Sequence, residues 1–553
     1  MMKLNKYTAI ALAAVAFAGC SKMDELAPQG STLLASQVKE TNAKVPERVS
    51  ASFNGMYTKI GEPTSVYGGG SADGRPDDWG FPMIAFSGDA EAADLVLADS
   101  DYNWFSVCGD LTSRSADYAN PYIRYAAPYN EIAAANDVIK AYPADTEDQN
   151  AIQQIAQARA IRAYSYLNLA PFFQFSYTVA ADKPCVPLVT ENTTDFTNNP
   201  RATVAQVYEL IMSDLNYAVE KLEGFTRPDK GRIDQKVAYG LRARANLNMG
   251  KWLEAAQDAE KAAEGFTPAT MDQLKVPSFY QLTEGNWIWG YDMTLEIAKI
   301  FPYATPSSWV RSFSGNAYAP ATQVYACINN LLYDKIPATD VRKNWWVNED
   351  LYSPILDEIV WPYEGTDYTG LGLANLEISD VKMAFLPYTN VKFGMNTIGS
   401  ENNDEDWPLM RVEEMILIQA EGYAKHGDPA KAKLILESFV KTYRDPAYSV
   451  EATGRSLEDE IWFQRRVELW GEGFANNDTR RLGKPLVRFH EGKKSNVPDN
   501  FQINLTPTDG WWLMRFPTAE KNTNFGIVDN TEGVSPVKYQ NGNLRDGVTD
   551  QSF

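Results

Sequence analysis

Two segments of the sequence share the pattern of a helix, a glycine turn and a second helix, and this pattern constrains the fold most. The first segment spans residues 235–264 and turns at Gly250, and the second turns at Gly427. When the two glycines are aligned, Ala255 falls on Ala432, and small residues at such positions let neighbouring helices approach closely. The pattern is typical of tetratricopeptide-type helix pairs, although two unrelated helical hairpins would show the same alanine spacing.

Further helices are predicted by apolar residues that recur at intervals of three and four. These segments are 130–142, 149–169 and 203–222. Pro143 and Pro171 predict the ends of the first two helices, and Thr203 is a suitable N-cap for the third. The sequence therefore predicts a mainly α-helical fold.

The part of the chain from about 266 to 406 has a different character. Helical periodicity fades there, while proline, glycine, asparagine and tryptophan become frequent. This composition predicts a loop-rich insertion with few short strands, carried by a helical scaffold at about 121–265 and 407–483. Residues 61–80 are also rich in glycine and proline and predict a loop. Binding sites usually lie on such loops because the scaffold holds them in place.

The N-terminal residues have the features of an export signal. Lys3 and Lys6 precede an apolar run over 9–18, which is too short to span a bilayer, and small residues lead directly to Cys20. This arrangement resembles a bacterial lipoprotein signal, in which Cys20 becomes the lipidated first residue of the mature chain. An ordinary secretory signal with a chance cysteine is the alternative.

The expected organisation follows from this leader. Residues 1–19 are expected to form the signal peptide, 20–50 a tether that leads into the first helix, and 51–553 one structural unit. No later stretch reaches the roughly 20 apolar residues of a membrane-spanning helix. The sequence therefore predicts a protein that is anchored to a membrane by lipid and not embedded in it.

Charge and metal-ligating residues exclude several classes of function. The net charge of −21 repels phosphate backbones, which argues against nucleic-acid binding. Cys108, Cys185 and Cys327 show no paired-cysteine metal pattern, so either buried free thiols or at most one disulfide is expected. The chain has only two histidines, which excludes a histidine-rich zinc site. No cofactor is predicted. The acidic run 401–407 could bind calcium but lacks EF-hand spacing, which favours a solvated loop.

Seven ordered segments together resemble the SusD/RagB family. They are ARAIRAYSYLNLAPFF (158–173), KPCVPLV (183–189), RATVAQVYELIMSDLNYAVEKL (201–222), GRIDQKVAYGLRARANLNMGKWLEAAQDAEKA (231–262), WPLMRVEEMILIQAEGYAKHG (407–427), FQRRVELWGEGFANNDTRRLGK (463–484) and RFPTAEKNTNFG (515–526). The resemblance implies a SusD-like helical scaffold and an outer-membrane lipoprotein that faces the cell surface. It also implies oligosaccharide binding without catalysis, and delivery of the ligand to a SusC-like TonB-dependent transporter.

The segment 463–484 departs from the family pattern at three positions. Ala475 stands where the family usually has arginine, and Asn476 and Asn477 replace an aromatic pair. The charged positions of the pattern remain, and we expect them to form a structural ion-pair network instead of a site. These positions are Arg465, Arg466, Glu468, Glu472 and Asp478.

Sugar recognition requires flat aromatic faces for the C–H faces of the rings and planar polar side chains for the hydroxyls. The loops supply several such clusters, and the resemblance favours those in the early loop and the insertion. The predicted ligand-binding residues are Asp78, Trp79, Asp101, Tyr102, Trp104, Trp287, Trp289, Trp309, Arg311 and Tyr318. The alternative for each aromatic residue is that it packs against the scaffold. Trp287 and Trp289 alternate along the chain, so one of them could face inward from a half-buried strand.

Three other functions remain open at this stage. A lipid-anchored glycoside hydrolase would need two carboxylates at a defined separation, and with 72 acidic residues adjacent pairs carry little information. An assembly protein would use the helix pairs to grip peptides and would have no sugar site. Within the family, the cargo could also be a peptide nutrient.

Overall fold

The computed structural model describes residues 46–63, 75–100, 104–112 and 114–530. Two compact units are distinguished, Met1–Ser52 and Phe53–Phe553. Helix α3 (Pro46–Lys59) crosses the boundary between them. Cys20, Asp101 and Tyr102 lie outside the described residues, and all other elements belong to the second unit.

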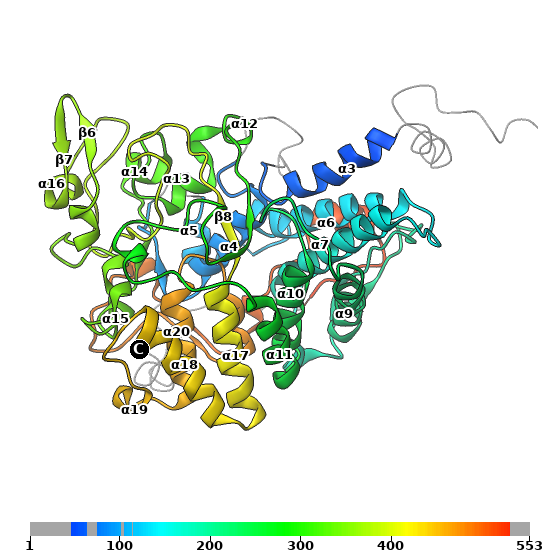
Figure 1. The fold of residues 1–553 in the computed structure, drawn as a ribbon. Coiled ribbons are helices and arrows are strands. Elements are labelled where there is room, and N and C mark those ends of the chain that lie inside the picture. The colour runs from blue at the N-terminus through cyan, green and yellow to red at the C-terminus, as the bar shows by residue number, and fades with distance from the viewer. Residues whose placement is uncertain (1–45, 64–74, 101–103, 113, 531–553) are drawn as a thin grey trace, which may run out of the picture. The chain divides into compact units, whose positions relative to one another are not determined.

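The second unit contains a continuous array of helices (Figure 1). Its members are α6 (Ala119–Lys140), α7 (Gln149–Phe173), α9 (Val204–Lys221), α10 (Gln235–Asn248), α11 (Trp252–Ala263), α17 (Val412–His426), α18 (Pro429–Tyr443) and α20 (Leu457–Glu468). Each helix packs against the next in this order up to α18, and α20 packs against both α17 and α18. The mainly α-helical fold predicted from the sequence is thereby confirmed.

The two repeat-like helix pairs are neighbours in space. One pair is α10 with α11 and the other is α17 with α18, and α11 packs directly on α17 although the whole insertion separates them in sequence. Gly422 of α17 lies at this contact. A Cβ at this position would lie 2.5 Å from the carbonyl oxygen of Trp252 and 2.9 Å from the Cβ of Ala256. The small residue therefore permits the close approach of the two helices.

Helix ends follow the predictions where local chemistry sets them. Thr203 is the N-cap of α9: its Oγ1 accepts a hydrogen bond from the Gln206 amide at 3.2 Å, while the Gln206 side chain accepts one from the Thr203 amide at 2.9 Å. This reciprocal arrangement is a capping box. Gly427 ends α17 in the left-handed conformation, as expected for a helix followed by a turn.

The predicted bounds of two helices are wrong. Helix α6 begins at Ala119 instead of residue 130 and includes Pro128, because the burial of its earlier turns compensates for one missing hydrogen bond. Helix α7 continues through Pro171 to Phe173. The guanidinium of Arg480 donates hydrogen bonds to the carbonyl oxygens of Pro171 and Gln174, so a tertiary contact fixes the end of this helix.

The insertion consists of short elements, as predicted. They are η1 (Gln273–Lys275), β4 (Trp287–Tyr291), α12 (Leu295–Ala298), η2 (Pro302–Ala304), α13 (Pro306–Val310), α14 (Tyr318–Thr322), β5 (Cys327–Ile328), α15 (Asn330–Tyr333), η3 (Val341–Trp345), η4 (Pro354–Asp357), β6 (Trp361–Tyr363), β7 (Thr366–Tyr368) and α16 (Gly370–Ala374). The antiparallel hairpin β6–β7 projects beside α16 (Figure 1).

Two pairs of strands join the insertion to the rest of the unit. Strand β4 pairs antiparallel with β8 (Trp407–Arg411), which leads into α17. Strand β1 (Leu95–Val96) pairs antiparallel with β5 and so connects the early part of the chain to the insertion. The insertion is therefore anchored on the early part of the chain and on the C-terminal part of the scaffold.

The remaining elements are short. They are α4 (Gly80–Glu91), α5 (Ser106–Gly109), α8 (Tyr177–Ala180), β2 (Pro184–Pro187), β3 (Arg201–Thr203), α19 (Val450–Thr453), α21 (Ala475–Arg481), β9 (Leu486–Val487), η5 (Asp499–Phe501), β10 (Asn504–Leu505), η6 (Gly510–Trp512) and α22 (Thr518–Thr523). Strands β2 and β3 pair antiparallel, as do β9 and β10.

The three described cysteines are buried free thiols. Burial raises the pKa of Cys108 to about 11 and the pKa values of Cys185 and Cys327 to about 12. The interpretation as buried free thiols is therefore confirmed. Such thiols are poorly reactive because the thiolate is the nucleophile.

Candidate functional site

Most of the predicted ligand-binding residues lie in the protein interior. Trp104 is half-buried. The other described residues of the set expose at most 4% of their surface; they are Asp78, Trp79, Trp287, Trp289, Trp309, Arg311 and Tyr318. For these seven residues, contact with a ligand at the surface is therefore not supported by their exposure.

Trp287 and Trp289 are core residues of β4. The interpretation of this segment as a half-buried strand, with one of the two tryptophans facing inward, is wrong because every residue of β4 is buried. Trp289 packs edge-on against Tyr164 of α7 with ring centroids 4.9 Å apart, and its Nε1 donates to the carbonyl oxygen of Gly231 at 3.3 Å. These tryptophans thus join the insertion to the helices and do not form an open platform.

Arg311 holds the insertion together. Its guanidinium donates to the carbonyl oxygens of Phe279 at 3.1 Å, Gly394 at 2.7 Å and Asp406 at 2.7 Å. Burial lowers the pKa of Arg311, although nearby carboxylates, foremost Glu405, oppose this. A guanidinium engaged by three carbonyl groups is a structural cross-link and leaves little capacity for a ligand.

Asp78 and Trp79 form the buried end of the early loop. Next to them, Arg75 forms a bidentate ion pair with Asp77, and both N···O distances are 2.9 Å. The following residue, Gly80, has a φ of +59°, and a Cβ there would lie 2.3 Å from the carbonyl oxygen of Ile60. Glycine is required at this turn, which packs Trp79 into the core.

The structure brings together predicted ligand-binding residues from the early loop and from the insertion. Trp104, from the early loop, lies 5.2 Å from Tyr318 and 6.5 Å from Trp309 between ring centroids, in edge-on orientations. Trp309 and Tyr318 stack at 4.8 Å with an interplanar angle of 29°. Tyr303 of η2 meets Tyr318 edge-on at 5.9 Å. We call Trp104, Tyr303, Trp309 and Tyr318 the aromatic cluster.

Exposure divides the aromatic cluster into two layers. Trp309 and Tyr318 are buried and form a rigid base, whereas Trp104 and Tyr303 are half-buried at the surface. In the sequence, only Asn103 separates Trp104 from Asp101 and Tyr102. The surface layer offers aromatic edges and faces whose orientation is fixed by the base beneath them.

Tyr303 was not among the predicted residues. The sequence FPYATP at 301–306 gives only a weak signal, an aromatic residue between two prolines, and such a residue also fits an ordinary turn. Its role depends on the proximity of α13 and α14, which no local pattern predicts.

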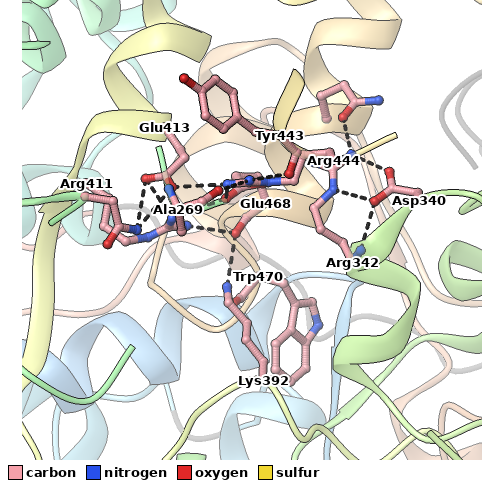
Figure 2. A network of polar contacts seen from close by, with 12 residues as sticks. Ala269, Asp340, Arg342, Lys392, Arg411, Glu413, Tyr443, Arg444, Glu468 and Trp470 are labelled. Carbon is pink, nitrogen blue, oxygen red and sulfur yellow. Dashed lines mark hydrogen bonds and ion pairs between the residues drawn. The ribbon is translucent and has the colours of Figure 1, made fainter. Parts of the chain in front are cut away.

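The charged residues of segment 463–484 form a second candidate site, centred on Glu468 (Figure 2). Its carboxylate accepts from Arg444 at 2.7 and 2.9 Å, and from Arg342 and Arg411 at 3.2 Å each. All four side chains expose 1% or less of their surface. Burial disfavours the charged form of Glu468 and raises its pKa. The three guanidinium groups have a larger effect in the opposite direction and hold the pKa of Glu468 far below its usual range.

The network extends through Glu472. Its carboxylate accepts from Arg411 at 2.7 and 2.8 Å and from Lys392 at 2.7 Å. Burial lowers the pKa of Lys392 to about 8, partly offset by Glu472. Because the charges satisfy one another without exposure to solvent, the expected structural role of this network is confirmed. The same holds for the pairs Arg465–Asp478, at 2.8 Å, and Arg466–Asp94, at 2.5 Å.

Beside the departure at Ala475 lies a buried carboxylate, Asp89, which is paired with backbone amides. Asp89 of α4 accepts from the amides of Gly473 and Ala475, both at 2.9 Å, and among the described residues no arginine or lysine forms an ion pair with it. Burial raises the pKa of Asp89 to about 7, and the charges of Asp94 and Glu472 add to this increase. Asp89 therefore binds a proton near neutral pH.

The acidic run 401–407 is not a solvated loop throughout. Asn403 and Glu405 are buried, Glu405 accepts from the Ser307 hydroxyl at 2.7 Å, and Asp406 accepts from the amides of Leu282 at 2.7 Å and Met293 at 3.0 Å. The prediction was wrong here because these polar groups cap and join other segments of the insertion. Within the described ranges no group of three or more His, Cys, Asp or Glu side chains could hold a metal ion.

Comparison with known proteins shows two family matches. The model SusD-like_3, described as starch-binding and associating with the outer membrane, matches residues 86–247, and the model of the SusD family matches residues 377–547. A SusD-like protein from Bacteroides ovatus is 23% identical over 343 residues, which cover 61% of this chain and 54% of that protein. The chain thus spans about half the length of this relative.

Solved structures share the fold. A SusD-like carbohydrate-binding protein from Bacteroides vulgatus is 22% identical and has a TM-score of 0.66, with 87% of this chain and 97% of that chain covered. A laminarin-binding SusD-like protein is 18% identical with a TM-score of 0.57, and 88% of this chain and 98% of that chain are covered. In the part of the chain that the structure describes, no helix is long and apolar enough to cross a membrane.

Proposed function

The chain belongs to the SusD family, and on this basis we propose that it captures an oligosaccharide at the cell surface and passes it to a SusC-like TonB-dependent transporter. In this proposal the protein is attached to the outer membrane through the lipidated Cys20. It binds its ligand without cleaving it. The family description as starch-binding and the laminarin-binding neighbour support an oligosaccharide as the ligand.

The aromatic cluster is the observation that carries the proposal. Trp104 and Tyr303 are half-buried and present part of their aromatic surface to solvent, and the buried Trp309–Tyr318 stack keeps them in place. Aromatic faces bind the apolar C–H faces of sugar rings, and a preorganised platform loses little conformational entropy on binding. Asp101 and Tyr102, the nearest predicted polar and aromatic neighbours in sequence, would supply hydrogen bonds to the hydroxyl groups.

Affinity electrophoresis tests this proposal. The mature chain, starting after Cys20, is run through gels that contain laminarin, starch, mannan or xylan. We expect at least one of these glycans to retard it, and Trp104→Ala and Tyr303→Ala to abolish most of the retardation. Tyr352→Ala is the matched control, because Tyr352 is an aromatic residue of the insertion that is 39% exposed and lies outside the cluster.

Two results would contradict the proposal. Unchanged migration in all four gels by a folded protein would favour a peptide nutrient as the cargo. Equal retardation of the wild type and Trp104→Ala would place the site elsewhere. Analysis of each glycan for shortened products after incubation separates binding from hydrolysis.

A further inference from the structure

A groove lies apart from the aromatic cluster, where three segments of the second unit meet. They are α6, the segment 187–199 and α22 with the residues around it. The groove has a volume of about 460 Å³. This is within the range of roughly 300–1,000 Å³ that is usual for small-molecule sites. None of its lining residues belongs to the aromatic cluster.

One wall of the groove is a row of tyrosines on α6. Tyr122, Tyr125 and Tyr129 occur at intervals of three and four residues, which places them on one face of the helix. Tyr125 is buried and contacts Tyr129 at 4.6 Å and Phe516 at 5.8 Å between ring centroids. Tyr122 and Tyr129 are half-buried, so they form the accessible part of this aromatic wall. The buried Tyr125 packs behind it.

The opposite wall is held in place by hydrogen bonds. Asn199 and Asn524 form a reciprocal pair, in which the Asn199 amide donates to Asn524 Oδ1 at 2.9 Å and Asn524 Nδ2 donates to the Asn199 carbonyl oxygen at 2.8 Å. The Phe525 amide donates to the carbonyl oxygen of Thr197 at 2.7 Å. Beside these contacts Phe196 extends into solvent with 56% of its surface exposed.

The polar groups of the groove are a carboxylate, side-chain amides and hydroxyls. Glu520 accepts from Asn524 Nδ2 at 3.0 Å, and the side chains of Asn130, Thr197 and Thr523 complete the lining. Among the described lining residues there is no arginine, lysine or histidine. An anionic ligand would therefore meet a carboxylate without a compensating cation, which disfavours phosphorylated or sulfated ligands.

We infer that this groove is a second carbohydrate site, which binds a neutral oligosaccharide between the tyrosines of α6 and Phe196. The aromatic side chains contact the C–H faces of the sugar rings, and the side chains of Glu520 and Asn130 bind the hydroxyl groups. The inference goes beyond the proposed function and does not depend on the aromatic cluster. A second site increases retention of a long glycan because the second contact is intramolecular once the first has formed.

Carbodiimide labelling of Glu520, followed by mass spectrometry, tests this inference. The mature chain is labelled alone and in the presence of laminarin, starch dextrin, mannan or xylan oligosaccharides. We expect at least one glycan to slow the labelling of Glu520 several-fold. Phe196→Ala should remove this protection without unfolding the protein, since Phe196 is largely exposed. Phe525→Ala is the control, because Phe525 is 78% exposed but does not line the groove.

The outcomes separate this site from the aromatic cluster. Protection that persists in Trp104→Ala and disappears in Phe196→Ala supports the inference, even if the cluster itself binds nothing. The inference is overturned if no glycan in the panel protects Glu520, or if protection is lost in Trp104→Ala and retained in Phe196→Ala. Protection by a casein digest in the absence of protection by any glycan would also overturn it, in favour of a peptide.

Discussion

Arg444 and Glu468 form a bidentate ion pair in the interior of the protein. Arg444 Nε donates to Oε2 of Glu468 at 2.7 Å and Nη2 donates to Oε1 at 2.9 Å, and neither side chain is exposed. Arg444 also donates to the carbonyl oxygen of Ala269 at 2.8 Å. The pair therefore joins the start of the insertion to the helices α18 and α20, and its integrity should be a condition of stability.

Glu468→Gln should destabilise the fold strongly. The substitution removes the buried carboxylate that Arg342, Arg411 and Arg444 share, and breaking such a pair costs about 3–5 kcal/mol. Urea unfolding measures this loss. Glu458→Gln is the control, since Glu458 is 58% exposed in its pair with Lys425 and should change stability by less than about 1 kcal/mol. A similar loss in both variants would contradict the importance of the network.

Asp89→Asn should become more stable relative to the wild type as the pH rises. The pKa of Asp89 is about 7 in the folded protein against an ordinary value of 3.8, so its contribution to the free energy of unfolding falls as pH rises from about 4 to 7. Asparagine does not titrate. The free energy of unfolding of the variant minus that of the wild type should therefore increase by roughly 2–4 kcal/mol over this range, at ~1.4 kcal/mol per pKa unit. Unfolding curves from about pH 4.5 to 8 measure it, and a difference independent of pH would refute the assignment.

Trp289→Ala should affect stability and not glycan recognition. The side chain is fully buried against Tyr164, and truncating a buried tryptophan costs about 3–5 kcal/mol. Trp289→Phe should lose less because it retains an aromatic ring. Thermal unfolding and affinity electrophoresis are measured on the same samples. Normal stability combined with lost binding would show that Trp289 contacts the ligand after all.

Gly422→Ala should weaken the contact between α11 and α17. The added Cβ would lie 2.5 Å from the Trp252 carbonyl oxygen, and relief requires the helices to move apart at a cost of about 1–3 kcal/mol. Gly55→Ala in α3 is the matched control: nothing lies within 4 Å of its Cβ, so the helix propensity of alanine should stabilise by up to about 1 kcal/mol. In thermal unfolding, we expect Gly422→Ala to lower the Tm and Gly55→Ala to raise it. Equal effects would mean that the helices are not closely packed at Gly422.

The helical part of the fold was predictable because its signals are local. The capping box at Thr203 and Gln206, the turns at Gly250 and Gly427 and the periodicity of α9 to α11 depend on residues a few positions apart. The family resemblance was also carried by continuous segments, and the matches over 86–247 and 377–547 confirm it. The end of α7 was missed because Arg480, a distant residue, fixes it.

The candidate site was only partly predictable. An aromatic residue in a polar loop has the same sequence pattern whether it faces solvent or the core, so Trp104 could not be told from Trp79 or Trp289. Their exposure depends on which distant segments cover them. The groove at Tyr129 was not predicted, because its walls come from three separate parts of the chain.

Local sequence was sufficient for the presence of most helices, for the turns between them and for the family, because short-range hydrogen bonding and hydrophobic periodicity specify them. The three-dimensional arrangement was needed to show that α11 packs on α17, that Glu468 is neutralised by Arg342 from the insertion, and that Trp104 meets Tyr318. These contacts join residues far apart in the chain. They depend on burial and on the close packing of several segments at once, which no local pattern encodes.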